Sequence, residues 1–415
     1  MDRRSRHPER GAILVQVAIL LMVLIGFTAF VVDYGVMLVG RRQAQNAADA
    51  GALAGAIAMA FDANGWDDRT PTGPARAGAH QMALSHGIWG EAPDVDVTTD
   101  VYFTDEPADM CPLDPAGLTP CIRVDVYRNQ ARGNPLPIIF GAAVGLVDQG
   151  VRATATARVA VADSSDCLKP WAIPDKWLDE HDITPVIDNE WTADDTFDLF
   201  DGNNGPPLPT PDVYTPASEN DPGTGFTLAT DLGDQVVLKQ GGPATSLSPG
   251  VFEPVRIPST YCPEPQGGDC YRYAIASCAG LPISIGDVLE SENGNMIGPT
   301  NQGVDDLIAL DEFAEWDTGS DPGSVINSCA QGAPPCAGSS PRVVAIPVFD
   351  TSHYYTTKRQ GLPQFKVVNI LGFFIENMQG NNVVGRLTTA PGLQMGNGPP
   401  NDPQSAFLTQ IQLIR

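Results

Sequence analysis

Positive charge is scarce in this 415-residue chain, which has 24 lysine and arginine residues against 50 aspartate and glutamate residues. The net charge of −26 is unevenly spread: the first 42 residues hold six arginines and three acidic residues, so the remainder carries −29. Such a surface repels nucleic acid and discourages docking onto anionic lipid. The composition therefore argues against a nucleic-acid partner and indicates an acidic, solvated exterior of an exported protein.

Motifs of the common catalytic and nucleotide-binding sites are also missing. None of the five histidines lies in an H-E-x-x-H pattern, and the chain has no G-x-S-x-G elbow, P-loop or G-x-G-x-x-G. His80 and His86 fall in a helix-like stretch, where we interpret them as surface or packing residues. The sequence thus predicts a protein that is not an enzyme and has no cofactor, apart from a Ca²⁺ candidate described below.

One long hydrophobic run is present near the N-terminus. It comprises the 22 residues from Gly11 to Val32 and is interrupted only by Gln16 and Thr28. This length matches the ~20 residues that cross a bilayer and exceeds the ~7–15 residues of a signal-peptide core. The arginines before the run place the N-terminus in the cytoplasm and the acidic bulk outside. We expect a single-pass anchor; removal as a signal peptide is the alternative.

The residues after this run predict that the helix continues beyond the membrane. The stretch "GRRQAQNAADAGALAGA" (Gly40–Ala56) has no proline or serine, and alanine is the strongest helix former. A continuous helix from about Ala12 to Phe61 would be ~75 Å long. Its small residues lie on one face, where another backbone can approach closely: Ala44, Ala47, Ala48, Gly51 and Gly55. The larger contacts on this face are expected from Leu53, Ile57 and Phe61. We treat the face as a candidate surface for a partner or a second copy; packing on the protein's own domain is the alternative.

Period-2 alternation predicts an antiparallel sheet after the helix. The expected strands are "VDVTTDVYF" (95–103), "IRVDVY" (122–127) and "VRATATARVAV" (151–161). Between the last two lies "PLPIIFGAAVGLV" (135–147), too short to span a membrane and expected as a buried helical turn or packed loop. A long helix laid on such a sheet is a pilin-like arrangement.

Beyond Cys167 the composition shifts to Pro, Gly, Asp and Thr, which indicates a second, β-rich domain. One helix is expected there, from about Asn301 to Trp316; its apolar face would comprise Val304, Leu307, Ile308 and Phe313. The stretches "RVVAIPVFD", "FKVVNILGFFIEN" and "NVVGRLTT" are expected as strands of a buried sheet. The predicted fold is α+β, organised as a basic cytoplasmic tail (1–10), a transmembrane helix (11–38), a pilin-like domain with an Ala-rich helix (39–162) and a β-rich extracytoplasmic domain (163–415).

Eight cysteines, an even number, indicate disulfides outside the cytoplasm. No pair has the C-x-x-C spacing of zinc or thiol-redox sites. Proximity in sequence favours three loop closures and leaves one long-range pair: Cys111–Cys121, Cys262–Cys270, Cys329–Cys336 and Cys167–Cys278.

Two acidic sites are candidates for metal binding. The segment "WTADDTFDLFDGNNG" gathers oxygen ligands of the kind that Ca²⁺ prefers, at Asp194, Asp195, Asp198 and Asp201, but it does not match an EF-hand loop. A solvated acidic loop is the alternative. In the second site, "VVAIPVFDTSHYY", Asp350 begins a pattern that resembles the D-x-S-x-S metal site of von Willebrand A domains. Tyr354 replaces its last serine, so we expect no metal there.

The first sixty residues carry a family resemblance. The segment "ERGAILVQVAILLMVLIGFTAFVVDYGVMLVGRRQAQNAADAGALAGA" strongly resembles the N-terminal region of TadG-like (TadE/TadG-like) proteins of the tight-adherence (Tad/Flp) pilus system. The residues that carry the resemblance are Gly11, Asp33, Gly35, Arg41, Arg42, Gln45, Asn46, Ala47, Ala48, Asp49, Ala50, Leu53 and Ala54. The stretches "CLKPWAIPD", "GPTNQGV" and "VVAIPVFD" are more loosely similar to larger members.

The resemblance implies a non-catalytic assembly or anchoring protein of a tight-adherence pilus or a related secretion apparatus. It would be a single-pass protein of the bacterial inner membrane with its bulk on the periplasmic side, and its partners would be other components of that apparatus or further copies of itself. Prepilin peptidases cut after a glycine, and pilins and pseudopilins carry a glutamate five residues on. Here these positions are Gly11 and Gln16, and a neutral glutamine cannot pair with a neighbour's new N-terminal amine. We expect an uncleaved anchor; pseudopilin-like processing at Gly11 is the alternative.

Two functions of other classes stay open. A membrane-tethered hydrolase would need a cleft with two facing carboxylates of raised pKa. A Ca²⁺-dependent adhesin would need an occupied acidic loop and would melt at a lower temperature in chelator.

Overall fold

A computed structural model describes the protein over residues 10–61, 68–103, 121–180, 191–192, 195–202, 205–218, 220–241, 246–264, 266–278, 280–319, 322–328, 340–395 and 402–414. The chain divides into two compact units. Unit 1 comprises Met1–Met59, Asn64–Val159 and Ile411–Arg415, and unit 2 comprises Ala60–Ala63 and Ala160–Gln410. The last five residues, expected in the second domain, belong to unit 1, where the Arg158 guanidinium donates to Gln412 Oε1 at 2.6 and 2.9 Å. The strand formed by residues 408–414 lies next to the strand formed by residues 151–161 in the sheet of unit 1, and a pairing between segments so far apart in sequence cannot be predicted from local sequence.

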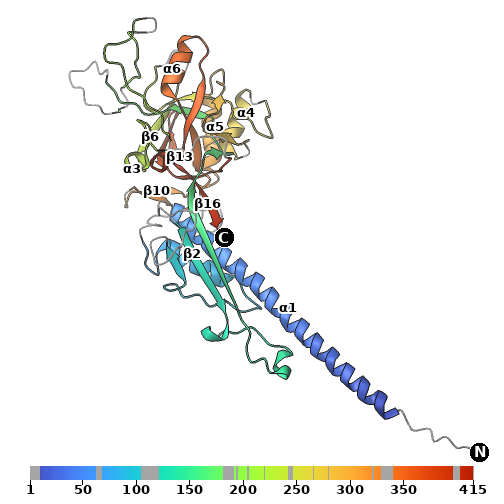
Figure 1. Ribbon diagram of the computed structural model, residues 1–415. Helices are drawn as coiled ribbons and strands as arrows, with labels where there is room; N and C mark the ends of the chain where they lie inside the picture. Colours follow the sequence, from blue (N-terminus) through green and yellow to red (C-terminus); the bar gives the residue numbers. More distant parts are fainter. Residues whose placement is uncertain are drawn as a thin grey trace, which may run out of the picture. The chain divides into compact units, whose positions relative to one another are not determined.

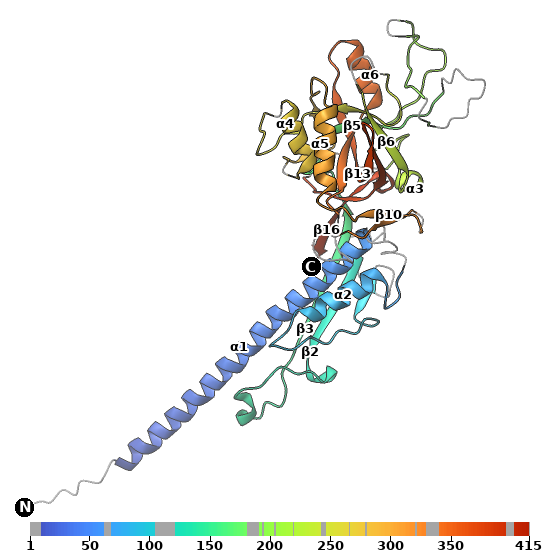
Figure 2. The same ribbon diagram turned by 180° about the vertical axis from the view of Figure 1, so that it is seen from behind.

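Helix α1 dominates unit 1 and runs without interruption from Arg10 to Phe61 (Figure 1). The expected continuous helix is therefore confirmed. Its 52 residues contain no proline, and alanines carry it through the part beyond the apolar run. A second helix, α2 (Pro74–Ser85), has proline in its first turn, where the missing N–H costs no hydrogen bond, and it lies beside the C-terminal part of α1 (Figure 2).

The sheet of unit 1 is antiparallel in its first three strands, β1 (Val101–Phe103), β2 (Cys121–Arg128) and β3 (Val151–Val161). Val124 lies opposite Val101 on one side and Ala155 on the other. The first strand is shorter than expected, because the Asp96 carboxylate accepts hydrogen bonds from the backbone N–H groups of Thr98 and Thr99 and bends the chain into a turn. The short helices η1 (Gln130–Arg132) and η2 (Gly141–Val144) fall in the β2–β3 connection.

Six strands of unit 2 close into a barrel. In ring order they are β12 (Val343–Phe349), β5 (Trp171–Pro174), β7 (Val251–Pro254), β6 (Gln235–Gln240), β14 (Asn382–Thr388) and β13 (Phe365–Gln379), and β13 pairs back with β12. The three expected closing strands are adjacent in this ring. The remaining strands are β4 (Ser164–Ser165), β8 (Ile283–Ser284), β9 (Val288–Leu289), β10 (Glu315–Asp317), β11 (Ser324–Ile326), β15 (Ala390–Pro391) and β16 (Leu408–Ile414). The fold is thus mixed α+β, as predicted.

The helices of unit 2 are α3 (Leu228–Asp231), α4 (Gly268–Ala276), α5 (Ile297–Ile308), α6 (Thr351–Arg359) and η3 (Pro403–Ser405). Helix α5 begins four residues before the expected Asn301 and ends eight residues before Trp316. Phe313, expected on its apolar face, is 64% exposed. The segment that follows α5 forms a turn instead, and the buried Arg342 donates to its Asp311 and Ala314 carbonyl oxygens at 2.9 and 2.8 Å.

Candidate functional site

The first part of α1 is suited to a lipid environment. Within the described residues, α1 is the one helix long and apolar enough to cross a membrane, with a mean hydropathy of 2.7 over its most apolar window. Its large apolar side chains are exposed: Ile13, Leu14, Val15, Val17, Ile19, Leu20, Leu21, Met22, Val23, Leu24, Ile25, Phe27, Phe30 and Val31. Gln16 is exposed among them, and Gly11 lies in the first turn of the helix.

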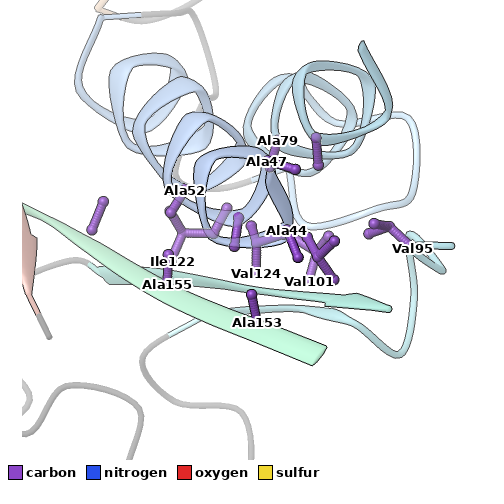
Figure 3. Packing of buried hydrophobic residues seen from close by; sticks show 14 of the residues in the cluster. Ala44, Ala47, Ala52, Ala79, Val95, Val101, Ile122, Val124, Ala153 and Ala155 are labelled. Atoms are coloured by element: carbon purple, nitrogen blue, oxygen red, sulfur yellow. The ribbon is translucent and has the colours of Figure 1, made fainter. Parts of the chain in front are cut away.

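The small-residue face of the outer half of α1 is fully covered within unit 1. Ala44, Ala47 and Ala48 have no exposed surface and belong to the core cluster of unit 1. In Figure 3, Ala47 lies toward Ala79 of α2, and Ala44 lies toward the sheet. A Cβ added at Gly51 would lie 2.9 Å from the Ala79 carbonyl oxygen, and one at Gly55 would lie 2.6 Å from Ile122 Cδ1. The face therefore contacts the protein's own domain, and its assignment as a partner surface was wrong.

The larger residues assigned to the same face do not share its burial. Leu53 and Phe61 are half-buried, and Ile57 is 50% exposed. At 3.6 residues per turn, a helix resting on both α2 and the sheet buries a wide stripe of small side chains and directs Ile57 outward.

Asp33 is buried where the apolar run of α1 ends. Its carboxylate accepts hydrogen bonds from three consecutive backbone N–H groups: Ile139 at 2.7 Å, Phe140 at 3.1 Å and Gly141. These groups belong to the segment 137–147, which we call the Asp33 loop. A Cβ at Gly141 would meet Leu146 Cδ2 at 2.8 Å and Asp33 Oδ2 at 3.0 Å, so the carboxylate can reach the backbone only beside a glycine.

The Asp33 loop is exposed, contrary to the expected buried turn. Ile139 is 52%, Phe140 46%, Leu146 42% and Val147 89% exposed. The apolar character of this segment and the place of Asp33 in the family pattern are both visible in the sequence. Their contact is not, because 106 positions separate Asp33 from Ile139.

Trp89 makes a further contact to the middle of α1, shortly after Asp33, that the sequence did not reveal. Its indole Nε1–H donates to the Val36 carbonyl oxygen at 2.9 Å, and its backbone N–H donates to Gln43 Oε1 at 2.9 Å. The residue has a φ of 52°, a left-handed conformation rare for a bulky side chain. These two hydrogen bonds to α1 offset the backbone strain.

The candidate Ca²⁺ loop is only partly described, since Asp194 lies outside the described residues. Asp195 accepts from the backbone N–H and hydroxyl of Thr192, and Asp198 accepts from the Thr196 hydroxyl at 2.6 Å. The Asp201 backbone N–H donates to the Pro206 carbonyl. Within the described part of the chain, no three His, Cys, Asp or Glu side chains gather as a metal site. Ca²⁺ binding stays a prediction, tested by the effect of chelator on the melting temperature.

The segment that resembles a von Willebrand A metal site forms a strand and a helix start. Asp350 is the N-cap of α6, and its carboxylate accepts from the His353 backbone N–H at 2.8 Å. The Thr351 hydroxyl donates to the Asp175 carbonyl oxygen, and the Tyr354 hydroxyl donates to Glu253 at 3.3 Å. The Asp350 carboxylate and the Tyr354 hydroxyl of this segment thus have structural partners.

Two of the four expected disulfides lie in the described residues. Cys167 is bonded to Cys278 with their Cα atoms 4.3 Å apart, and Cys262 to Cys270 with theirs 5.9 Å apart. Cys121 is also disulfide-bonded. Its expected partner Cys111, and the expected pair Cys329–Cys336, lie outside the described residues.

The hydrolase alternative requires facing carboxylates, and Asp179 and Asp212 form one such pair among the described residues of unit 2. Burial and the adjoining Asp179 raise the pKa of Asp212. Both side chains are buried, and Asp212 accepts from the backbone N–H groups of Glu180 at 3.0 Å and Asp198 at 2.7 Å. Asp212 therefore links its own segment by hydrogen bonds to the segments that contain Glu180 and Asp198. A cleft of about 580 Å³ in the same unit is lined by other residues, among them Lys176, Asp231 and Asp234. Burial and the neighbouring Asp231 raise the pKa of Asp234, while Asp231 itself forms an ion pair with Lys176 at 2.6 Å.

Two further buried groups serve the fold of unit 2. Lys169 is fully buried, and burial lowers its pKa to about 7. Its ammonium donates to the carbonyl oxygens of Ala274 and Ser277 at 3.3 and 2.7 Å, at the C-terminal end of α4. Burial raises the pKa of Asp175 to about 7, and its carboxylate accepts from the Phe226 backbone N–H and the Tyr214 hydroxyl. Both residues lie in "CLKPWAIPD", so that stretch is explained by packing.

Together these features define a class: a protein whose one long apolar helix continues as the central helix of an α+β unit. Residues 11–60 match the family described as putative Flp pilus-assembly TadE/G-like. This match coincides with α1 and confirms the resemblance found in the sequence over these residues. No curated protein and no solved structure matches the chain significantly.

Proposed function

We propose that this protein is a membrane-anchored structural or assembly component of a tight-adherence (Flp-type) pilus or a related secretion apparatus, and that it acts without catalysis. The observation that carries the proposal is the coincidence of the family match, residues 11–60, with a helix that changes character along its length. Its first part exposes apolar side chains, and its second part is buried in unit 1. A helix of this kind couples an extracytoplasmic domain rigidly to the membrane.

The proposed topology places the N-terminus in the cytoplasm and both units outside the inner membrane. Four arginines within the first ten residues support this orientation. The disulfides of unit 2 support an oxidising compartment. The outer half of α1 packed on an antiparallel sheet supports a pilin-like unit 1, by analogy of architecture.

An intact mass of the protein extracted from its own membranes tests the anchor. We expect an N-terminus before Ala12, because Gln16 lacks the charge that a processed pilin subunit uses. A start at Ala12 itself would mean that the protein is processed like a pseudopilin. A start beyond Val32 would mean that the apolar segment is removed, which contradicts the anchor.

The partners proposed are other membrane components of the apparatus and further copies of this chain. Because the small-residue face of α1 is covered by α2 and the sheet of unit 1, we expect the contacts with these partners on other surfaces of the protein. Purification of the full chain in mild detergent should recover pilus-assembly components, and deletion of its gene should abolish pilus formation. Isolation as a lone monomer together with normal pili in the deletion strain would refute the proposal.

Complementation of the deletion separates assembly from hydrolysis. We expect the full chain carrying Asp212→Asn to restore pili as well as the unchanged chain does, because a structural role does not require a titrating carboxyl. Melting of the purified variant shows whether it folds. A folded Asp212→Asn protein that fails to restore pili would favour the hydrolase.

A further inference from the structure

We propose that the Asp33 loop, residues 137–147, is a second membrane contact of this protein. It would enter the outer boundary of the bilayer that α1 crosses, with Asp33 as its positioning residue. The inference rests on the proposed membrane anchor and adds a lipid-binding element to it. The partner is the boundary between lipid headgroups and acyl chains.

The composition of the loop fits this surface. Its sequence, "PIIFGAAVGLV", contains no charged, amide or hydroxyl side chain. Four of its large side chains point outward, and Val147 is 89% exposed. Isolated exposed apolar residues are common on soluble proteins, but an all-apolar segment that presents four of them together indicates an interaction surface.

The position of the loop along α1 identifies lipid as the partner. Asp33 directly follows the apolar run that ends at Val32, and it holds the loop at this level through three hydrogen bonds. On the same side of α1, Ala29 is buried one turn further into the run, whereas its neighbours Phe30 and Val31 are exposed. The apolar surface of the loop is therefore continuous with that of the membrane-crossing part of α1, and both views of the fold show the loop beside α1 (Figures 1 and 2).

The hydrogen bonding of the loop suits a medium with little water, where unsatisfied backbone groups are costly. The Asp33 carboxylate satisfies three N–H groups in succession. The Leu146 N–H donates to the Gly141 carbonyl at 2.9 Å, and the Gln149 side chain donates to the Pro137 carbonyl. The loop thus presents hydrocarbon outward, and these backbone groups have partners on α1, in the loop itself or on Gln149.

Residues beyond this level, on the side away from the apolar run, follow the usual order of a membrane interface. Tyr34 is 47% and Trp89 38% exposed, and aromatic rings of this kind concentrate at headgroup depth. Arg41 and Arg42 are exposed about 12 Å further along the helix axis, where long cationic side chains reach lipid phosphates.

Spin labels on the full chain reconstituted in phosphatidylethanolamine–phosphatidylglycerol vesicles test the proposal. One label is placed at Val147→Cys in the loop and a second at Leu20→Cys in the proposed membrane span. The matched control is Ile57→Cys, an exposed apolar position on the same helix about 36 Å beyond Asp33. Labelling without reductant preserves the disulfides. Accessibility to oxygen, which partitions into lipid, is compared with accessibility to a water-soluble nickel complex.

We expect the labels at 20 and 147 to favour oxygen and the label at 57 to favour the nickel complex. A label at 147 that favours nickel while the label at 20 favours oxygen overturns the loop proposal and leaves the anchor intact. A label at 20 that favours nickel overturns both. A label at 147 that is aqueous in vesicles and shielded in native membranes also overturns lipid contact and assigns the loop to a protein partner.

A second variant tests the positioning role of Asp33. In the Val147→Cys background, Asp33→Ala should make the label at 147 more accessible to the nickel complex and less accessible to oxygen. In the Leu20→Cys background, the same substitution should leave the accessibility of the label at 20 unchanged. Asp33→Asn retains one accepting oxygen and should restore part of the oxygen preference. An unchanged label at 147 in Asp33→Ala would show that the loop reaches the bilayer without this residue and would overturn that role.

Discussion

Two glycines at the contact between α1 and α2 should respond oppositely to the same substitution. Gly51 lies on α1, and an added Cβ would meet the Ala79 carbonyl oxygen at 2.9 Å, Ala83 Cβ at 3.0 Å and Val124 Cγ1 at 3.4 Å. Gly78 lies on α2, and its added Cβ would meet only the Ala54 carbonyl oxygen, at 3.9 Å. Both positions are inside helices, so they share the same gain in helix propensity.

The magnitudes follow from two opposing effects. Replacing a helical glycine by alanine gains about 1 kcal/mol. Overpacking a filled contact costs about 1–3 kcal/mol, and the nearest atom to Gly51 is a backbone oxygen that moves only if α2 moves. We expect Gly78→Ala to stabilise unit 1 by about 1 kcal/mol, and Gly51→Ala, with the same gain set against the overpacking cost, to destabilise it by up to about 2 kcal/mol.

Hydrogen exchange of the β2 amides measures the difference in stability between the two variants within unit 1. It does not require the two units to unfold in one transition. A difference of about 2 kcal/mol between the variants corresponds to roughly 30-fold in exchange rate. Equal slowing of exchange in both variants would refute the reasoning, because it would mean that α1 and α2 are not in close contact at Gly51.

Two further predictions concern unit 2. Burial raises the pKa of Asp175 to about 7 from 3.8, so this carboxyl favours folding while protonated and its contribution is lost as the pH rises from about 4 through 7. The melting temperature of unit 2 should fall over that window, and Asp175→Asn should flatten the fall; an equal slope in the variant would contradict this. Among the disulfides, replacing both cysteines of Cys167–Cys278 by serine should cost about 5 kcal/mol, against about 3 kcal/mol for Cys262–Cys270, because the first closes a loop of 111 residues and the second one of 8. Denaturant titration of the two double variants measures the order, and a larger cost for the shorter loop would contradict the loop-entropy argument.

Features that depend on local sequence were predictable. The apolar run and the alanines after it specify one uninterrupted helix, because both halves favour helix and neither contains proline. The alternation of "VRATATARVAV" corresponds to strand β3 at both ends. The N-terminal pattern identified the family that matches residues 11–60.

Features that depend on distant neighbours were not predictable. The small-residue stripe of α1 fits a partner helix as well as it fits the protein's own α2, and only the fold shows that Ala79 and Ile122 occupy it. Helix α5 ends at Ile308, and the turn after it is held by Arg342, a residue distant in sequence whose contact nothing near Ile308 indicates.

The sequence by itself determined that this protein has a long apolar helix, an acidic exterior and cysteines suited to disulfides, because hydropathy, charge and composition are sums over the chain. Only the tertiary structure decided that Asp33 holds residues 139–141 beside the end of the apolar run. A carboxylate that binds backbone N–H groups recognises no particular side chain. The residues that supply these N–H groups therefore show no pattern in the sequence. The contact forms only when the folded sheet places the loop between β2 and β3 beside α1.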